Sequence, residues 1–327
     1  MFDKSNIEIF ILTYNRKDFL HDAIISVLNQ SLGLVDITVM DNASNDGTEE
    51  LIKNLQIKYT NIKYHKREIN NPIDNFKQAV QLASKDYMML FHDDDILHPD
   101  YLKYALMAIN RHPTTTVVSS YYKEFTCPNN LNWKKVSKTI HYIKSRNNFV
   151  DYLCYHQNFT FSSTIYKTEN LKKYVTKQSD ELMEFKLMGK LCDKPMVVNS
   201  MQSDDDVIIL ANKYLVRYRV HPGQDTQTPG PYYDQIIEFN KFYKSYMSRN
   251  WYSNFLFNLI NYKQLKCAYI WGKDYTLTLN EFIKKAIDEG AGCKYTQLCI
   301  SQFGTIFIEL AHIFRKFLKS NYRSENL

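Results

Sequence analysis

The chain has 327 residues, of which 44% are hydrophobic and 14% aromatic, with a formal net charge of +6. This composition excludes a disordered chain and allows one large domain with a smaller appendage. The six cysteines form no CxxC pair and no zinc-like spacing, so they read as ordinary thiols in a reducing compartment. No signal-peptide pattern and no bilayer-length apolar run are present, and we expect a cytoplasmic protein, at most peripheral on the inner face of the plasma membrane.

The N-terminal third alternates strand and helix patterns. Strands are predicted at residues 7–13, 35–40, 61–65 and 87–91, and helices at 19–28, 49–55 and 74–84. Thr48 is predicted to cap the second helix, whose first turn is acidic. Strand–helix–strand alternation implies right-handed crossovers, and the expected fold class is α/β, a Rossmann-like and mostly parallel sheet flanked by helices.

The rest of the chain is less regular. Strands are predicted at residues 117–125 and 214–220, a strand-like run at 207–210, and helices at 149–156 and 181–190. Pro222-Gly223 and Pro229-Gly230-Pro231 mark a boundary. Everything after Tyr232 is expected to be helical.

The triplet Asp93-Asp94-Asp95 directly follows an apolar run of strand length. Carboxylates packed this closely repel each other and need a cation or open solvent, and their oxygens suit Mg²⁺ and Mn²⁺. A solvated acidic turn is the commoner explanation of such a cluster taken alone. Ligands of open α/β sheets, however, bind outside the carboxyl ends of the strands, which favours a metal–diphosphate site.

Polar residues also follow two other predicted strands, at Thr13-Tyr14-Asn15-Arg16 and at Asp41-Asn42. An Asp can accept the N3–H of a uracil or thymine ring, an aromatic side chain can stack on the base, and an Arg can pair with a phosphate. Each residue alone is as well explained as a turn former or a surface charge. Together at one sheet edge they indicate a nucleotide pocket.

Four strings in this order resemble the family 2 glycosyltransferases with the GT-A fold. They are Thr13-Tyr14-Asn15-Arg16, Ser26-Val27-Leu28-Asn29-Gln30, Asp41-Asn42-Ala43-Ser44-Asn45-Asp46-Gly47-Thr48 and Asp93-Asp94-Asp95-Ile96-Leu97-His98-Pro99-Asp100. The match is dense over residues 5–105 and thinner to about residue 225. The resemblance implies a GT-A domain at residues 1–230, with a nucleotide-binding half at 1–110 and an acceptor half at 111–230, followed by a helical region at 231–327.

The resemblance also implies the roles of individual residues. The nucleotide-sugar is expected to bind at Thr13, Tyr14, Asn15, Arg16, Asp41, Asn42, Asn75, Asp93 and Asp94. Mn²⁺ or Mg²⁺ is expected at Asp95, His221 and Asp93, with the acidic triplet as the DXD motif. The sequence departs from the family at His92, where related sequences often carry an Asp, and this shifts the weight of metal binding to Asp95.

An inverting sugar transfer needs a general base beside the acceptor hydroxyl. In the family this base is the Asp of a Glu-Asp pair that precedes a Tyr-Arg-x-His string, and Cys192-Asp193 precedes Tyr218-Arg219-Val220-His221 by the expected spacing. The resemblance therefore implies that Asp193 is the base, although Cys192 stands where Glu is common. The cluster Asp204-Asp205-Asp206 is the alternative, and it is more typical of a solvated turn.

The expected function is a metal-dependent inverting transfer of a sugar from a UDP-sugar to a saccharide or lipid-linked acceptor in bacterial surface polysaccharide synthesis. Two alternatives stay open: a sugar nucleotidyltransferase, which would usually carry a glycine-rich N-terminal loop, and a non-catalytic nucleotide- or glycan-binding protein. Nucleic-acid binding fits poorly, because the charge is modest and no binding motif is present.

The tail differs from the body in charge and pattern. Residues 231–327 carry 13 Lys and Arg against 8 Asp and Glu, a charge of +5, which leaves +1 for residues 1–230. Apolar residues recur at helical spacing from Ile300 to Leu318, with basic residues among them. A helix packed on the domain or in a homodimer explains this stripe, and so does a peripheral helix on anionic lipid.

Overall fold

The computed structural model describes most of the chain. The described residues are 1–127, 131, 133, 138–155, 162, 164–177, 193–211, 214–222, 224, 232–246, 257, 261, 265, 269, 278–290 and 322–327. Several features of the sequence analysis lie outside them: the helix expected at 181–190, Cys192, the Pro229-Gly230-Pro231 boundary, and the apolar stripe from Ile300 to Leu318.

A nine-stranded sheet runs through the molecule in the order β12-β8-β10-β6-β9-β4-β1-β2-β3. Its strands are β1 (Ile7–Thr13), β2 (Asp36–Asp41), β3 (Ile62–Lys66), β4 (Tyr87–His92), β6 (Thr115–Ser120), β8 (Thr139–Lys144), β9 (Ile165–Lys167), β10 (Asp206–Leu210) and β12 (Arg323–Asn326). Strands β4, β1, β2 and β3 are parallel neighbours, and within the sheet only β8 and β9 run against the other strands. The predicted, mostly parallel α/β sheet is confirmed.

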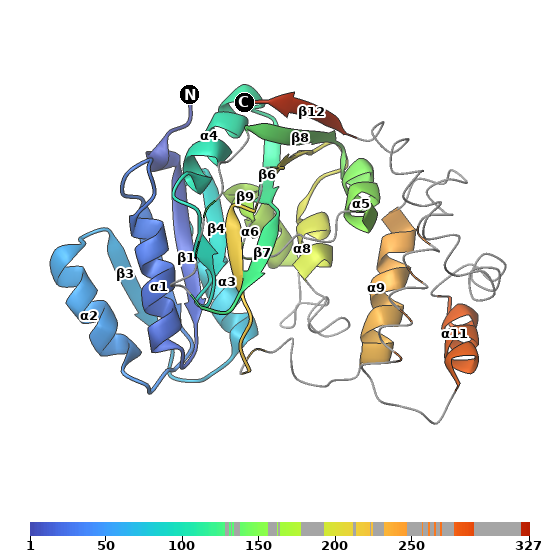
Figure 1. Ribbon diagram of the computed structural model, residues 1–327, viewed down its shortest axis with the longest axis horizontal. Helices are drawn as coiled ribbons and strands as arrows, with labels where there is room; N and C mark the ends of the chain where they lie inside the picture. The colour runs from blue at the N-terminus through green and yellow to red at the C-terminus, as the bar shows by residue number, and fades with distance from the viewer. Residues whose placement is uncertain are drawn as a thin grey trace.

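Helices cover both faces of this sheet (Figure 1). The helices of the described part of the chain are α1 (Lys17–Leu28), α2 (Thr48–Lys58), α3 (Pro72–Leu82), α4 (Tyr101–Arg111), α5 (Arg146–Tyr155), α6 (Thr168–Lys177), α8 (Asp193–Ser200), α9 (Tyr232–Tyr246) and α11 (Leu279–Asp288), with a short 3-10 turn η1 (Lys4–Asn6) before β1. Helix α11 packs on α9 and lies away from the sheet. Side chains alternate across a strand, so Ile9 of β1 joins a core with α1, α2 and α4, whereas Phe10 joins the core of α3, α5, α6, α8 and α9.

A second sheet of three strands lies beside the end of β4. It has the order β5-β11-β7, with β5 (Ile96–Leu97), β7 (Tyr122–Phe125) and β11 (Val216–Arg219). Strand β11 pairs antiparallel with β5 and parallel with β7. Because β5 begins directly after the acidic triplet, this small sheet connects the triplet to β11, about 120 residues further along the chain.

The structure corrects two local predictions. The run 117–125 is not one strand: β6 belongs to the large sheet and β7 to the small one, and the chain passes between them at Tyr121. Thr48 is not the cap of α2, since Gly47 takes the N-cap position with φ of 91°. The Thr48 hydroxyl instead donates a hydrogen bond to Asp46 at 2.6 Å.

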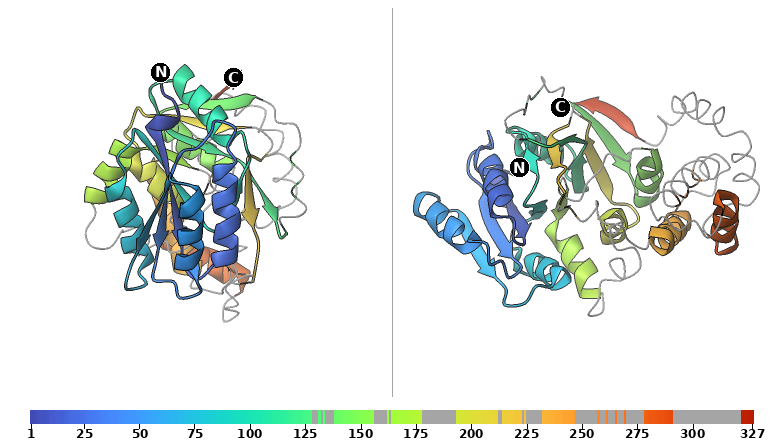
Figure 2. Two further views of the ribbon diagram at one scale, coloured as in Figure 1. Left: turned by 90° about the vertical axis from the view of Figure 1, so that its left-hand side faces the viewer. Right: turned by 60° about the horizontal axis from the view of Figure 1, so that its bottom comes forward.

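The tail is joined to the body at two places. Helix α9 packs Phe239 and Tyr243 into the core beside α5 and α8, and α11 forms a smaller apolar cluster with Ile236 and Ile237 of α9 (Figure 2). The expectation of helices alone after Tyr232 is wrong at the end of the chain, where β12 pairs antiparallel with β8. No helix in the described part of the chain is long and apolar enough to cross a membrane.

Candidate active site at the end of strand β4

The acidic triplet forms the turn between β4 and β5, and all three side chains are buried. Asp93, Asp94 and Asp95 are exposed by only 2%, 3% and 0%. This burial removes the solvated-turn explanation, because ionised carboxylates out of water require compensation. Burial and the adjacent charge of Asp94 raise the pKa of Asp93 to about 6 and that of Asp95 to about 7.

Cationic and hydrogen-bonding groups from two segments, one after β1 and one after β11, converge on Asp93 and Asp94. Arg16 Nη1 lies 3.3 Å from Asp93 Oδ1 and 3.2 Å from Asp94 Oδ2. The backbone N–H of Tyr14 donates to Asp93 Oδ2 at 3.3 Å. On the other side, His221 Nε2 lies 3.2 Å from Asp94 Oδ2. The ends of β1 and β11 therefore meet at the triplet and bring Arg16 and His221 beside it.

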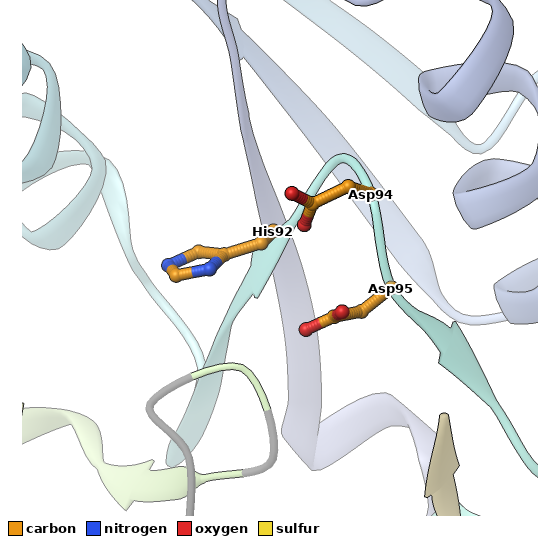
Figure 3. A group of neighbouring side chains, drawn as sticks. All are labelled: His92, Asp94 and Asp95. Carbon is orange, nitrogen blue, oxygen red and sulfur yellow. The ribbon is translucent and has the colours of Figure 1, made fainter. Parts of the chain in front are cut away.

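Three side chains at this turn could hold a metal ion. One ligand atom each from His92, Asp94 and Asp95 lies within 4.8 Å of the others, and Figure 3 shows the two carboxylates extending from the turn on the side where His92 lies. Asp94 Oδ1 and Asp95 Oδ2 are buried and accept no hydrogen bond from the described residues. Imidazole with carboxylates is a donor set that suits Mn²⁺, so the residues fit a divalent cation.

This group differs in part from the expected ligands Asp95, His221 and Asp93. Asp95 is common to both sets. Asp93 is engaged by Arg16 and Tyr14, and His221 reaches the group through Asp94 and packs against the Phe19 ring with a 4.7 Å centroid separation. His92 was noted in the sequence only as a departure from the family. The turn after β4 brings His92 beside Asp94 and Asp95, which strand periodicity alone does not predict.

The loops after β1 and β2 are locked together next to the triplet. Asn15 has a φ of 52°, its N–H donates to Ser44 Oγ at 2.8 Å, and its Oδ1 accepts from the N–H of Asn45 at 2.8 Å. Asn favours such a left-handed position because its short polar side chain bonds locally. Tyr14 is 43% exposed at this rim, whereas Thr13 is buried.

Asp41 and Asn42 at the end of β2 are buried and already hydrogen bonded. Asp41 Oδ1 accepts from the N–H of Ser44 at 2.8 Å, and Asp41 Oδ2 accepts from the Tyr64 hydroxyl at 2.5 Å. Burial and this bond raise the pKa of Tyr64 above its usual range. Each carboxylate oxygen has two lone pairs, so Asp41 keeps acceptor capacity for a further donor.

The side-chain amides of Asn42 and Asn75 connect the end of β2 to helix α3. Asn42 donates to Asn70 at 2.6 Å and accepts from the N–H of Asn71, which caps α3. Asn75 donates to the carbonyl of Met40 at 3.0 Å, while its Oδ1 is buried and accepts no hydrogen bond from the described residues. A buried amide oxygen of this kind is available to a ligand.

Asp193 and the alternative acidic cluster occupy different settings. Asp193 is the first residue of α8 and is half-buried. Asp206 starts β10 and accepts from the hydroxyls of Thr114 and Tyr142 at 2.6 and 2.7 Å, and Asp205 accepts from Asn170 at 2.8 Å. The second cluster is thus largely engaged in structural hydrogen bonds.

Comparison with known proteins identifies the family. The model of "Glycosyl transferase family 2" matches residues 8–174, about half of the chain. Abequosyltransferase RfbV of Salmonella typhimurium is 42% identical over 96 residues, 28% of this chain and 29% of the relative's length. The uncharacterized glycosyltransferase MJ1057 of Methanocaldococcus jannaschii is 24% identical over 269 residues, 77% of this chain and 81% of its own.

A solved structure agrees with the fold. TarS 1–349 of S. aureus in complex with UDP-GlcNAc superposes with a TM-score of 0.64 at 16% identity, over 89% of this chain and 82% of that one. This likeness is evidence for the GT-A fold alone. The family match, the named relatives and the fold agree, and the chain belongs to glycosyl transferase family 2.

Proposed function

We propose that the protein is a metal-dependent, inverting glycosyltransferase that moves a sugar from a UDP-sugar to a saccharide or lipid-linked acceptor of a cell-surface polysaccharide. The observation that carries this proposal is the acidic turn: three buried carboxylates at the end of a parallel strand, two of them with an oxygen that accepts no hydrogen bond from the described residues. Burying three carboxylates together destabilises the folded state, and a bound cation would offset their mutual repulsion.

The donor nucleotide would bind along the ends of β1, β2 and β4. Thr13, Tyr14 and Asn15 form the rim, and the exposed Tyr14 ring offers a stacking surface for the base. Asp41 would accept an imino N–H, and Asn42 and Asn75 would support the ribose side. Arg16 would turn to the diphosphate. The TarS complexes with UDP and UDP-GlcNAc support this choice of donor class.

The cation would be held by Asp95 as its main ligand, with Asp94 and His92 beside it and Asp93 and His221 on the adjoining side. Bound there, Mn²⁺ or Mg²⁺ would neutralise charge on the donor diphosphate as the bond to the sugar breaks. The chain's own residues keep the site dry and hold its carboxylates in place, because all three Asp side chains are buried.

Asp193 would act as the base. Its carboxylate would take the proton of the acceptor hydroxyl while that oxygen attacks the anomeric carbon opposite the leaving UDP, which inverts the configuration.

The deciding experiment is hydrolysis of a panel of UDP-sugars by the purified protein with Mn²⁺, with Mg²⁺ and with EDTA. We expect release of UDP from one or a few donors only when a divalent cation is present, and thermal stabilisation by the same donors. Equal turnover in EDTA would contradict metal dependence. Stabilisation by GDP-sugars and not by UDP-sugars would contradict the donor class.

A further inference from the structure

Arg219 ends strand β11 and lies directly beneath the acidic turn. Its side chain is almost fully buried, with 2% of the residue exposed. Strand β11 pairs with β5, the two residues that follow the acidic triplet, and Arg219 itself is in register with Phe125 of β7. A buried arginine requires several well-placed partners, because its charge cannot be removed by deprotonation.

The backbone and side chain of Arg219 hold two consecutive residues of the turn. Its N–H donates to Asp95 Oδ1 at 3.0 Å, and its Nε donates to the backbone carbonyl of Asp94 at 2.8 Å. With Asp95 Oδ1 occupied in this way, Oδ2 is the oxygen left without a hydrogen bond from the described residues. This contact belongs to the backbone at position 219, whereas the contact to the Asp94 carbonyl belongs to the Arg219 side chain.

The far end of the guanidinium is anchored to helix α1. Nη2 donates to Asp22 Oδ2 at 2.9 Å. The guanidinium carbon lies 4.5 Å from the ring centroid of Phe19 and 4.7 Å from that of Phe125. Planar stacking together with two directed hydrogen bonds fixes a guanidinium in a way that an ammonium group does not reproduce.

We propose that Arg219 is a positioning residue that sets the acidic turn for cation binding, by holding the Asp94 backbone against Asp22 and α1. The inference rests on the metal site of the proposed function. Groups that orient metal ligands typically change metal affinity by roughly 10–100-fold when they are replaced. The cation would not touch Arg219, so the residue acts through Asp94 and Asp95.

The test measures binding of Mn²⁺ alone by electron paramagnetic resonance, which counts the free ion. Arg219→Lys keeps the charge but cannot bond the Asp94 carbonyl and Asp22 together, and we expect its Mn²⁺ dissociation constant to rise by roughly 10-fold or more. Asp22→Asn should give a smaller rise in the same direction. In the hydrolysis assay, the Mn²⁺ concentration for half-maximal rate should rise while turnover at saturating Mn²⁺ largely recovers.

Arg217→Lys is the matched control. Arg217 lies two residues earlier on β11, is 7% exposed, and its guanidinium lies 4.7 Å from the Trp133 ring centroid. Its Mn²⁺ affinity should stay within about twofold of wild type. The metal-free melting temperatures of the two Lys variants identify any loss of affinity that comes from unfolding.

The outcomes separate the two claims. If Arg219→Lys binds Mn²⁺ with the same affinity as the wild-type protein, the role of Arg219 is overturned and the metal site itself stands. If Arg217→Lys loses as much Mn²⁺ affinity as Arg219→Lys, the role of Arg219 is also overturned, because any disturbance of β11 would then have the same effect. Absence of Mn²⁺ binding by the wild-type protein overturns the metal site itself, and with it the role of Arg219.

Discussion

Asp94 is held on several sides while one of its oxygens stays open. Arg16 and His221 both lie 3.2 Å from Oδ2, Arg219 takes the carbonyl at 2.8 Å, and Oδ1 accepts no hydrogen bond from the described residues. Asp95 repeats the pattern with the Arg219 N–H on Oδ1. Carboxylates constrained in this way lose little freedom on binding a cation, which is the physical advantage of a pre-organised site.

Replacing Asp95 by Asn should separate stability from function. Asn keeps the shape and can still accept from the Arg219 N–H, but it removes a buried charge next to Asp94. We expect the metal-free melting temperature to stay equal or rise, because like-charge repulsion in the turn falls. Stabilisation by Mn²⁺ with UDP should disappear together with turnover.

Asp100→Asn serves as the control for this change. Asp100 lies five residues further on and accepts a hydrogen bond from the Ser31 hydroxyl, outside the group of candidate ligands. It should retain the Mn²⁺-dependent shift. Wild-type turnover of Asp95→Asn at limiting Mn²⁺ would contradict the assignment of Asp95.

Replacing Asp193 by Asn should affect chemistry and not donor binding. The amide preserves size but accepts no proton, and general base catalysis is typically worth roughly 10²–10⁴-fold in rate. Transfer should fall by that factor, while the melting-temperature shift given by UDP-sugar and Mn²⁺ remains. If donor binding weakens while the transfer rate stays near normal, Asp193 is not the base and the cluster Asp204–Asp206 becomes the candidate.

At the scale of elements, the sequence predicts the parallel half of the sheet best. Strands β1, β2 and β4 are buried along most of their lengths and mostly apolar, and helix patterns of a different period alternate with them, so the sequence shows both the type and the order of these elements. The end of each strand then places Thr13–Arg16, Asp41 and Asp93–Asp95 at one edge. This part of the candidate site needs only the rule that parallel strands end on the same side.

The remaining elements depend on partners that are distant in sequence. Strands β9 and β12 have three and four residues, too few to show a period, and β5 has two. The sequence pattern predicts one strand at 117–125, because nothing in the local pattern indicates that the chain passes from one sheet to the other at Tyr121. The sequence also could not predict the hydrogen bonds of the Arg219 side chain to Asp22 and to the Asp94 carbonyl. These bonds join residues up to 197 positions apart.

Strand β8 carries a partly buried histidine that should make the fold acid-sensitive. His141 lies among three tyrosines, and its Nδ1 is 2.8 Å from the Tyr152 hydroxyl. Burial lowers its pKa from 6.5 to about 4. Below pH 6.5 the unfolded chain binds a proton that the folded chain does not, so stability falls as pH drops from about 6.5 towards 4.

His141→Phe should flatten this dependence, at some cost in stability at pH 7.5 from the lost hydrogen bond. The measurement is the urea midpoint at pH 7.5 and at pH 5.0 for the wild type, the variant, and His21→Gln. His21 has a half-exposed side chain and should behave as the wild type. Parallel losses in wild type and His141→Phe would show that other groups cause the acid sensitivity.

At the scale of the molecule, the C-terminal region is part of the fold and not a detachable appendage. Phe239 and Tyr243 of α9 are buried in the core that contains Phe10 of β1, and Glu325 of β12 meets His112 at 3.1 Å. A truncation at Tyr232 would expose this core and remove β12 from the sheet. The role of the tail must therefore be tested in the full-length protein.

The charge split, +5 in residues 231–327 against +1 before them, together with the apolar stripe from Ile300 to Leu318, predicts contact with an anionic membrane surface. Full-length protein should co-sediment with vesicles that contain phosphatidylglycerol at low salt, and not with neutral vesicles. Added salt should weaken the association, because exposed charges are screened beyond about 8 Å at physiological ionic strength. Replacing Arg315, Lys316 and Lys319 by Gln should reduce the association with vesicles, while UDP and Mn²⁺ binding stays unchanged, since every proposed ligand precedes Gly223.

Full-length protein that does not bind anionic vesicles at low salt would contradict the membrane role. It would favour a packed helix or a homodimer contact, and sedimentation velocity distinguishes these two.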